Sequence, residues 1–397
     1  MADVASRQAP RFTPRRRGGA RELVRDEQVR SLDWVLQVAV LGLVIMGALL
    51  IWAATKDAQT RHGLDPNAYL KKDILNVGIG LLLGTFAARV DYRALRAYAP
   101  IVYVLSILGL LAVLSPLGST INGAHSWIVL PAGFQIQPAE FAKVALVVGM
   151  AMILGEKRDA ESKPRGTDVL LVLALAVVPM ALIMLQPDFG TMMVFTFIIL
   201  GTIAISGADA RWVVGLVTAG VLFGGAIIGF HLLKPYQEAR LTSFAHATQD
   251  ISSTGYNVAQ AKTAIGSGGL FGQGLFDGAQ TNGGYVPEQQ TDFVYTVAGE
   301  ETGFLGSSVI LALMGIVLWR GVRIATRAEE VFGALIAAGV VSWFAFQSFI
   351  NIGMTLGIMP VTGLPLPFVS YGGSSMFAEM IAIGLLQNVH LRSSIRE

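Results

Sequence analysis

Asp292 stands where a polar stretch leads back into apolar sequence, which is a position suited to acid–base chemistry. It follows the run Pro287-Glu288-Gln289-Gln290-Thr291. A carboxylate that is partly removed from water at such a boundary becomes a stronger base, which favours proton abstraction from a hydroxyl group. We therefore predict Asp292 as a catalytic base. From position alone, the alternative is a helix N-cap or a solvated loop acid.

Three more charged residues fall inside or at the edge of apolar segments. Glu140 and Lys143 are three positions apart and share one face of a predicted helix. Ionised groups in a membrane cost about 2.5–3.5 kcal/mol each on insertion scales, so they usually pair or face a cavity. Asp188 lies between two apolar segments, where it is either an interfacial cap or a second acid that lines the same cavity. A purely structural ion pair is the alternative for Glu140 and Lys143.

A long polar stretch, residues 233–302, contains the cations Arg240 and Lys262. A connection of this length usually carries function. The two cations are suited to holding a pyrophosphate by charge-assisted hydrogen bonds, and the alternative is pairing with Glu238 or Asp250. The glycines between residues 266 and 274 lack the Gly-Lys-Ser/Thr ending of a phosphate-binding loop, so we expect no nucleotide there.

Membrane-spanning helices must position these residues. Of the 397 residues, 53% are hydrophobic and only 14% are charged, whereas soluble domains carry about 25% charged residues. The absence of cysteine excludes disulfides and thiolate chemistry. Apolar runs of about 20 residues can span a bilayer. We predict an all-α polytopic protein with about ten such helices, near residues 32–53, 73–89, 98–115, 138–155, 168–185, 189–206, 212–232, 303–319, 332–354 and 373–390.

The distribution of arginine and lysine predicts the orientation. If the arginine-rich tail, residues 1–31, is cytoplasmic, most other arginine clusters fall on cytoplasmic connections, in agreement with the positive-inside rule. A single transmembrane domain then covers residues 32–392, the stretch 233–302 is extracytoplasmic, and residues 393–397 return to the cytoplasm. The tail has the charge to bind nucleic acid or anionic lipid, but orientation of the chain explains it more simply, and we expect no nucleic-acid partner.

A run near the C-terminus contains too many prolines and glycines for a continuous helix. It reads NIGMTLGIMPVTGLPLPFVSYGGSS and covers residues 351–375. Unsatisfied backbone groups are not tolerated facing lipid, so we expect the run to lie at a membrane surface or to line a cavity. Its order of residues closely resembles the signature of the SEDS family, the multi-spanning cell-wall proteins that include RodA, FtsW and SpoVE.

The resemblance extends from about residue 32 to residue 392 and implies roles for the polar residues above. The acid that follows the family's Pro-Glu-x-x-Thr motif is essential for glycan polymerisation, and it corresponds to Asp292. The segments around residues 140 and 188 resemble motifs whose charged side chains line a central polar cavity. The substrate-binding or cavity-lining residues implied in this way, together with the two loop cations, are Glu140, Lys143, Asp188, Arg240, Lys262, Ser370, Tyr371 and Ser374.

Membership would imply a peptidoglycan glycosyltransferase of the bacterial cytoplasmic membrane that polymerises lipid II, with inversion, during cell elongation. The run 360–368 looks most like the RodA branch. Asp292 would be the base, and Lys262, Arg240 or a divalent cation (Mg²⁺ or Mn²⁺) would stabilise the leaving pyrophosphate. The implied partners are a class B penicillin-binding protein, other membrane proteins of the elongation complex and membrane lipid. A lipid II flippase and a non-catalytic scaffold are the alternatives.

The chain departs from the family pattern at a few positions. Gln290 and Ser126 stand where members often carry His and Arg, respectively. The sequence assigns no role to Glu379 inside the last apolar segment, where it would either pair with an arginine or face a cavity. Glu300 and Glu301 precede the eighth segment, and we expect them to complement the dipole of that helix.

Overall fold

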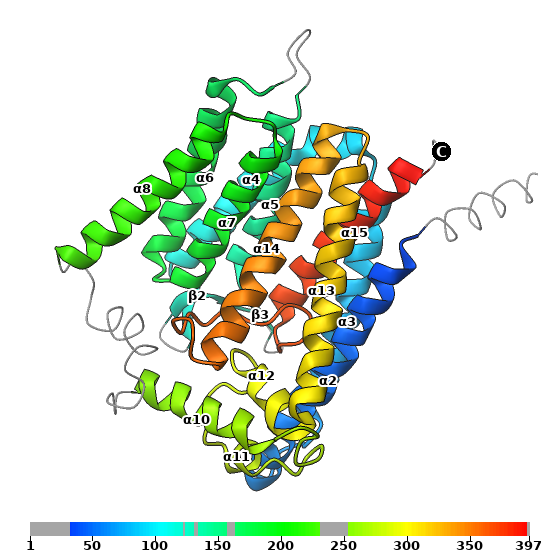
Figure 1. Cartoon of the computed structure of the whole chain (residues 1–397), viewed down its shortest axis with the longest axis vertical. Helices are drawn as coiled ribbons and strands as arrows, with labels where there is room; N and C mark the ends of the chain where they lie inside the picture. Colours follow the sequence, from blue (N-terminus) through cyan, green and yellow to red (C-terminus); the bar gives the residue numbers. More distant parts are fainter. Residues whose placement is uncertain (1–31, 122–123, 131–133, 157–162, 231–252, 395–397) are drawn as a thin grey trace, which may run out of the picture.

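Long helices run side by side through most of the chain in a computed structural model that describes residues 32–121, 124–130, 134–156, 163–230 and 253–394 (Figure 1). Each of the predicted apolar segments falls on one of them. These helices are α2 Trp34–Arg61, α3 Ala68–Arg89, α4 Tyr92–Leu114, α5 Pro138–Leu154, α6 Gly166–Leu185, α7 Phe189–Ile205, α8 Ala210–Gly229, α13 Gly303–Arg327, α14 Val331–Thr355 and α15 Gly373–Ser394.

Several of these helices have the length and composition of membrane spans. Among the described residues, five helical stretches are long and apolar enough to cross a membrane: α2, α4, α6, α14 and the stretch Val294–Arg327 that includes α13. Helix α7 and most of α8 are shorter apolar helices. The fold is therefore that of a polytopic helical membrane protein, as predicted, whereas the number of ten spans stays a prediction.

A small antiparallel sheet, which the sequence analysis did not predict, connects α4 to α5. Its strands are β1 Gly118–Ile121, β2 Ala124–Val129 and β3 Gln135–Ile136, in that spatial order. Ile128 of β2 pairs with both Gly118 and Ile136. Strands of two to six residues are too short to show a clear alternation of polar and apolar side chains, which is why the pattern gave no signal.

The described part of the long polar stretch is folded rather than open. It contains α10 Ser253–Ser267, α11 Ala279–Gly283, α12 Val294–Val297 and a π-helical turn, Ala298–Thr302, that leads into α13. Helix α2 extends past its predicted end and supports this region. Trp52 meets Phe276 edge-on with 4.7 Å between ring centroids, and Arg61 donates a hydrogen bond of 2.6 Å to the carbonyl of Asn282. We call this end of the bundle, with β1–β3 and α10–α12, the loop end.

The opposite end, where α2 begins and α13 and α15 end, carries many arginines and is called the arginine end (Figure 1). Asp33 is the N-cap of α2 and forms a 2.6 Å ion pair with Arg320 of α13. Both backbone polar groups of Asp33 bond to the side-chain amide of Gln387 on α15. These contacts join three helices at a single residue.

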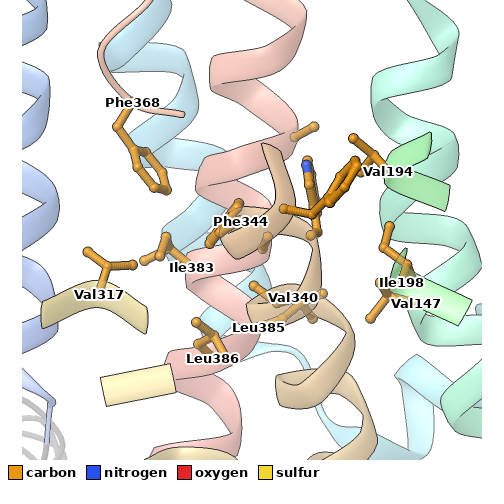
Figure 2. Close-up of a cluster of buried hydrophobic side chains, with 14 of the residues drawn as sticks. Val147, Val194, Ile198, Val317, Val340, Phe344, Phe368, Ile383, Leu385 and Leu386 are labelled. Carbon is orange, nitrogen blue, oxygen red and sulfur yellow. The ribbon is translucent and has the colours of Figure 1, made fainter. Parts of the chain in front are cut away.

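Helix α14 runs through the centre of the bundle, and Figure 2 shows its apolar side chains packed between those of α5, α7, α13 and α15. Val340 and Phe344 of α14 belong to this cluster and are 1% exposed. Phe344 also meets Phe368, in the segment between α14 and α15, edge-on at 5.1 Å. The core therefore holds this irregular segment in place as well as the helices.

Candidate functional site

The segment 356–372, between α14 and α15, is irregular as predicted, and most of its residues from 364 to 370 are buried. Gly357 and Gly363 adopt φ angles of +68° and +74°, a left-handed conformation that glycine takes without strain. The side chains of Asn351 and Gln347, on α14, donate hydrogen bonds to the carbonyls of Leu364 and Pro365, at 2.7 and 2.8 Å. Side chains thus satisfy the backbone groups that a helix would otherwise pair.

Ser370 and Glu379 satisfy backbone groups in the same segment. The Ser370 hydroxyl accepts a 2.8 Å hydrogen bond from the Leu366 amide, and Ser370 is 3% exposed. Glu379 accepts a 2.9 Å bond from the Phe368 amide. No ion pair joins Glu379 to an arginine among the described residues, so its carboxylate serves the backbone instead. The contacts of Ser370 are likewise internal, and its predicted role toward a substrate stays a prediction.

Glu140 and Lys143 form the predicted ion pair, with 2.8 Å between Oε1 and Nζ. Both side chains are buried, and Lys143 Nζ also donates a 3.1 Å hydrogen bond to Gln347 Oε1. The same ammonium lies 4.5 Å from the centre of the Trp343 ring. Gln347 links the pair directly to the segment 356–372. The pair therefore supports the irregular segment, whereas lining of a substrate cavity stays a prediction for both residues.

Asp188 is the N-cap of α7. Its carboxylate accepts bonds from the backbone amide and the hydroxyl of Thr191, at 3.0 and 2.8 Å, and from Gln137 Nε2 at 3.0 Å. The backbone amide of Gln137 donates a second hydrogen bond, to Ser374 Oγ at 2.9 Å. Asp188 and Ser374 thus belong to one hydrogen-bonded chain that links α7, the start of α5 and the start of α15. Asp188 forms the cap that its position suggested.

Asp292 lies at the start of the short helix α12, beside the irregular segment. The Glu288 carbonyl accepts hydrogen bonds from the amides of residues 291, 292 and 293, at 3.1–3.2 Å, which closes the turn before Asp292. Asn351 Nδ2 donates to the Asp292 carbonyl at 2.8 Å. The carboxylate itself faces Gly363, where an added Cβ would lie 3.4 Å from Oδ2. Asp292 is half-buried, at the boundary between loop and bundle that the sequence predicted.

Tyr371 is next to this boundary. Its amide donates a 2.8 Å hydrogen bond to the Gln290 carbonyl, and its ring meets Tyr69 of α3 edge-on at 5.1 Å. Burial, together with the neighbouring Tyr69 and Asp73, raises the pKa of Tyr371 to about 12. A tyrosine hydroxyl is neutral near pH 7 even at its ordinary pKa, and the raised pKa keeps the proton on Tyr371 in more alkaline solution as well.

Lys262 of α10 borders the other part of the irregular segment. Its side chain is exposed and lies against Gly357, where an added Cβ would collide with it. Lys262 and Asp292 thus flank residues 357 and 363 of one segment, at the loop end. Arg240, the second predicted cation, lies outside the described residues.

Glu300 and Glu301, the two acids of the π-helical turn, accept hydrogen bonds from backbone amides of the folded loop. Glu300 accepts bonds from the amides of Gln280 and Thr281 and from the Thr281 hydroxyl, at 2.7–2.8 Å, and Glu301 accepts from the Phe276 amide at 3.1 Å. Both are at most 1% exposed. They hold the first turn of α11 and the loop before it, a role that the sequence did not predict, while their expected effect on the dipole of α13 stays a prediction. Nothing in the local sequence indicates partners 19 to 25 positions away.

Two further observations concern a cavity and possible metal ligands. A cavity of about 240 Å³ lies at the arginine end, between the start of α4, the α13–α14 connection and the end of α15, and not at the loop end where Asp292 lies. Among the described residues, no three His, Asp or Glu side chains are grouped so as to hold a metal ion.

Comparisons with known proteins agree on one family. The model of a family described as cell cycle protein, FtsW/RodA/SpoVE, matches residues 33–395. Stage V sporulation protein E of Bacillus subtilis is 38% identical over 90% of this chain and 97% of its own length. Peptidoglycan glycosyltransferase MrdB of Escherichia coli is 33% identical over 90% of this chain and 93% of its own length.

A solved structure shares the fold as well. A chain from a study titled "Structural coordination of polymerization and crosslinking by a peptidoglycan synthase complex" matches with a TM-score of 0.75 and 31% identity. The match covers 91% of this chain and 98% of that chain. The sequence match, the helical architecture and the irregular segment beside Asp292 together show that this chain belongs to the FtsW/RodA/SpoVE family of membrane proteins.

Proposed function

We propose that this protein is a peptidoglycan glycosyltransferase that polymerises lipid II. The observation that carries the proposal is the placement of Asp292, a half-buried carboxylate held beside Gly363 where the folded loop meets the bundle. Lys262 borders the same segment and supplies a positive charge. The name of the relative MrdB, a peptidoglycan glycosyltransferase, supports the same reaction class.

The proposed reaction is an inverting displacement. Asp292 accepts the proton of the acceptor sugar hydroxyl, whose oxygen attacks the anomeric carbon of the donor. The bond from that carbon to the lipid pyrophosphate breaks, and the pyrophosphate leaves with the bonding electrons. A positioned general base contributes about 10²–10⁴-fold to such a step.

The leaving pyrophosphate needs positive charge near the same segment. Lys262 provides an exposed ammonium there, and Arg240, the second predicted cation, would add a guanidinium suited to two hydrogen bonds with a phosphate. A bound Mg²⁺ or Mn²⁺ would supply the same charge neutralisation. Tyr371, whose amide bonds the turn that leads to Asp292, would donate a hydrogen bond to the substrate.

The proposed orientation places the loop end outside the cytoplasmic membrane and both chain termini in the cytoplasm. The arginines gathered at the other end support this orientation through the positive-inside rule. The similar chain from a synthase complex supports a transpeptidase partner, which we propose to be a class B penicillin-binding protein. We further propose a role in cell elongation because the run 360–368, which includes Val361 and Thr362, looks most like the RodA branch. To test the assignment, the protein is expressed in two bacterial strains. It should restore growth of a strain depleted of its elongation polymerase and should not restore growth of a strain depleted of its division polymerase.

The experiment that tests the proposed activity compares Asp292→Asn with Asp277→Asn. Asp277 is an exposed acid of the same loop region, so its variant controls for loss of one negative charge. Purified full-length proteins, alone and with a class B partner, are incubated with labelled lipid II. We expect polymer from the wild type and Asp277→Asn, and a loss of about 10²-fold or more from Asp292→Asn.

The possible outcomes separate the alternatives. Full activity of a folded Asp292→Asn protein would reject the assigned base. If the wild type yields no polymer even with a partner, the polymerase assignment is rejected, and translocation of lipid II in vesicles then distinguishes a flippase from a scaffold. A flippase would depend on Glu140 and Lys143 more than on Asp292, whereas a scaffold would depend on none of them.

A further inference from the structure

A stripe of one tryptophan and two arginines lies along α13 at the arginine end. Trp319, Arg323 and Arg327 are spaced four positions apart, so they share one face of the helix. Trp319 is 54% exposed, and the guanidinium of Arg323 lies 5.7 Å from the centre of its ring. Tryptophan is enriched where a membrane meets water, which places both arginines at the depth of lipid head groups.

Unlike two other arginines at this end, Arg323 and Arg327 have no carboxylate partner among the described residues. At the same end, Arg320 is paired with Asp33 at 2.6 Å and Arg96 with Glu330 at 3.0 Å. Within the described ranges, no ion pair involves Arg323 or Arg327. Their positive charge is therefore available to an external anion.

The surroundings of the stripe are positively charged as well. His390 of α15 lies within electrostatic range of Asp33 and of all three arginines of α13's last turns. Asp33 is 3% exposed and is occupied by Arg320. Of the described groups whose charges act on His390, three are guanidinium groups and one is a carboxylate, so positive charge predominates among them.

We propose that the surface formed by Trp319, Arg323, Arg327 and His390, here called the α13 corner, binds the phosphate of an anionic phospholipid. Guanidinium groups form paired, charge-assisted hydrogen bonds with phosphate oxygens, and basic surfaces between membrane helices favour anionic head groups. The acyl chains lie along the exposed apolar side of α13, which includes Leu311. This site does not depend on the proposed glycosyltransferase activity.

A matched pair of double variants tests the proposal. Arg323→Gln/Arg327→Gln removes the two arginines of the stripe. Arg89→Gln/Arg93→Gln removes two exposed arginines of the same end, near the α3–α4 connection, that are likewise in no described ion pair and follow no tryptophan. Both double variants change the net charge by the same amount.

The measurement is native mass spectrometry of the full-length protein released from detergent that contains equal amounts of phosphatidylglycerol and phosphatidylcholine. We expect the wild type and Arg89→Gln/Arg93→Gln to retain phosphatidylglycerol selectively. Arg323→Gln/Arg327→Gln should lose roughly tenfold or more of that bound lipid. Arg323→Lys/Arg327→Lys, which keeps the charge but not the paired geometry, should fall between them.

Three results would overturn the proposal. Equal losses in the two Gln double variants would show general attraction to a positive surface. Unchanged retention by Arg323→Gln/Arg327→Gln would place the lipid elsewhere. Exclusion of phosphatidylglycerol from the wild type by a co-purified membrane helix would assign the α13 corner to a protein partner. Melting curves in phosphatidylcholine alone establish that each variant is folded. Added phosphatidylglycerol should raise the Tm of the wild type and of Arg89→Gln/Arg93→Gln, in which the stripe is intact, and should not raise the Tm of Arg323→Gln/Arg327→Gln.

Discussion

Lys143 is an ionised side chain with 0% exposure in the centre of a helical bundle. Its charge is compensated by Glu140, by the Gln347 amide oxygen and by the face of Trp343. Glu140 Oε2, by contrast, has no hydrogen-bond partner among the described residues. Removal of the lysine would leave a buried carboxylate with even less compensation, and an uncompensated buried charge strongly destabilises the folded state.

We therefore predict that Lys143→Met lowers the stability of the folded protein by about 3–5 kcal/mol. The double variant Glu140→Gln/Lys143→Met should be considerably more stable than Lys143→Met alone, because it removes both charges. Thermal unfolding in detergent, followed by the loss of monomer on size-exclusion chromatography, measures both effects. A double variant as unstable as the single one would show that packing, and not charge compensation, is the role of Lys143.

Glu379 offers a second test at the scale of one residue. Its carboxylate accepts the amide of Phe368, whose φ angle is +63°, so the bond helps to hold a strained turn. We predict that Glu379→Gln, which keeps an acceptor oxygen, is tolerated. Glu379→Leu should destabilise the fold by about 1–3 kcal/mol because it leaves a buried amide without a partner. The same unfolding assay applies, and equal stability of both variants would reject this role.

At the scale of elements, the contact of α3 with α15 depends on close approach of the two backbones. A Cβ added at Gly384 would collide with the Gly84 carbonyl, and one added at Gly84 would lie 2.6 Å from the Met380 carbonyl. The buried face of α3 consists of small or polar residues. Small residues at such contacts allow membrane helices to pack by van der Waals contact, in the absence of a hydrophobic driving force between helices.

We predict that Gly384→Ala separates α3 from α15 and destabilises the protein by about 1–3 kcal/mol. Gly78→Ala is the matched control, because Gly78 lies on the same helix as Gly84 and an added Cβ there meets nothing within 4 Å. The control should be neutral or slightly stabilising, since alanine favours a helix. Hydrogen exchange of α3 amides reports the contact directly, and equal exchange in the two variants would contradict the prediction.

The folded part of the long polar stretch, residues 253–302, holds the candidate site in place. The carboxylates of Glu300 and Glu301 bind the amides around α11, while Trp52 and Arg61 of α2 contact the same loop. The loop is thus tied both to the start of α13 and to the extended end of α2. This explains how a connection of such length can present Asp292 in one position.

At the scale of the whole molecule, the two ends differ in chemistry. The loop end holds Asp292 and Lys262 beside the irregular segment, and the arginine end gathers positive charge where α2, α13 and α15 meet. A multi-pass membrane protein with this asymmetry is expected to have one orientation in the bilayer.

The absence of cysteine from the natural chain allows a clean test of that orientation. We predict that Leu270→Cys, at the loop end, reacts with a membrane-impermeant maleimide in intact spheroplasts. Arg93→Cys, at the arginine end, should react only after the membrane is permeabilised. Both positions are exposed, so access and not burial decides the result. Labelling in the reverse order would refute the proposed topology.

The sequence alone determined the long helices, the Glu140–Lys143 pair and the break between α14 and α15. Apolar length is a local property, so each long helix was predictable from its own segment. The Glu140–Lys143 pair was predictable for the same reason, because residues three apart on a helix always share a face. The break in helical structure at residues 351–375 follows from its prolines and glycines, although α14 continues to Thr355 before the chain becomes irregular.

The tertiary structure decided what those residues contact. Lys143 meets Gln347 at a separation of 204 positions, and Asp33 meets Gln387 at 354. Glu300 and Glu379 serve backbone amides that no local pattern could identify. Such partners depend on how the helices pack, which is a property of the whole chain. The short strands β1–β3 are set by pairing with one another, because segments of so few residues have little structural preference of their own.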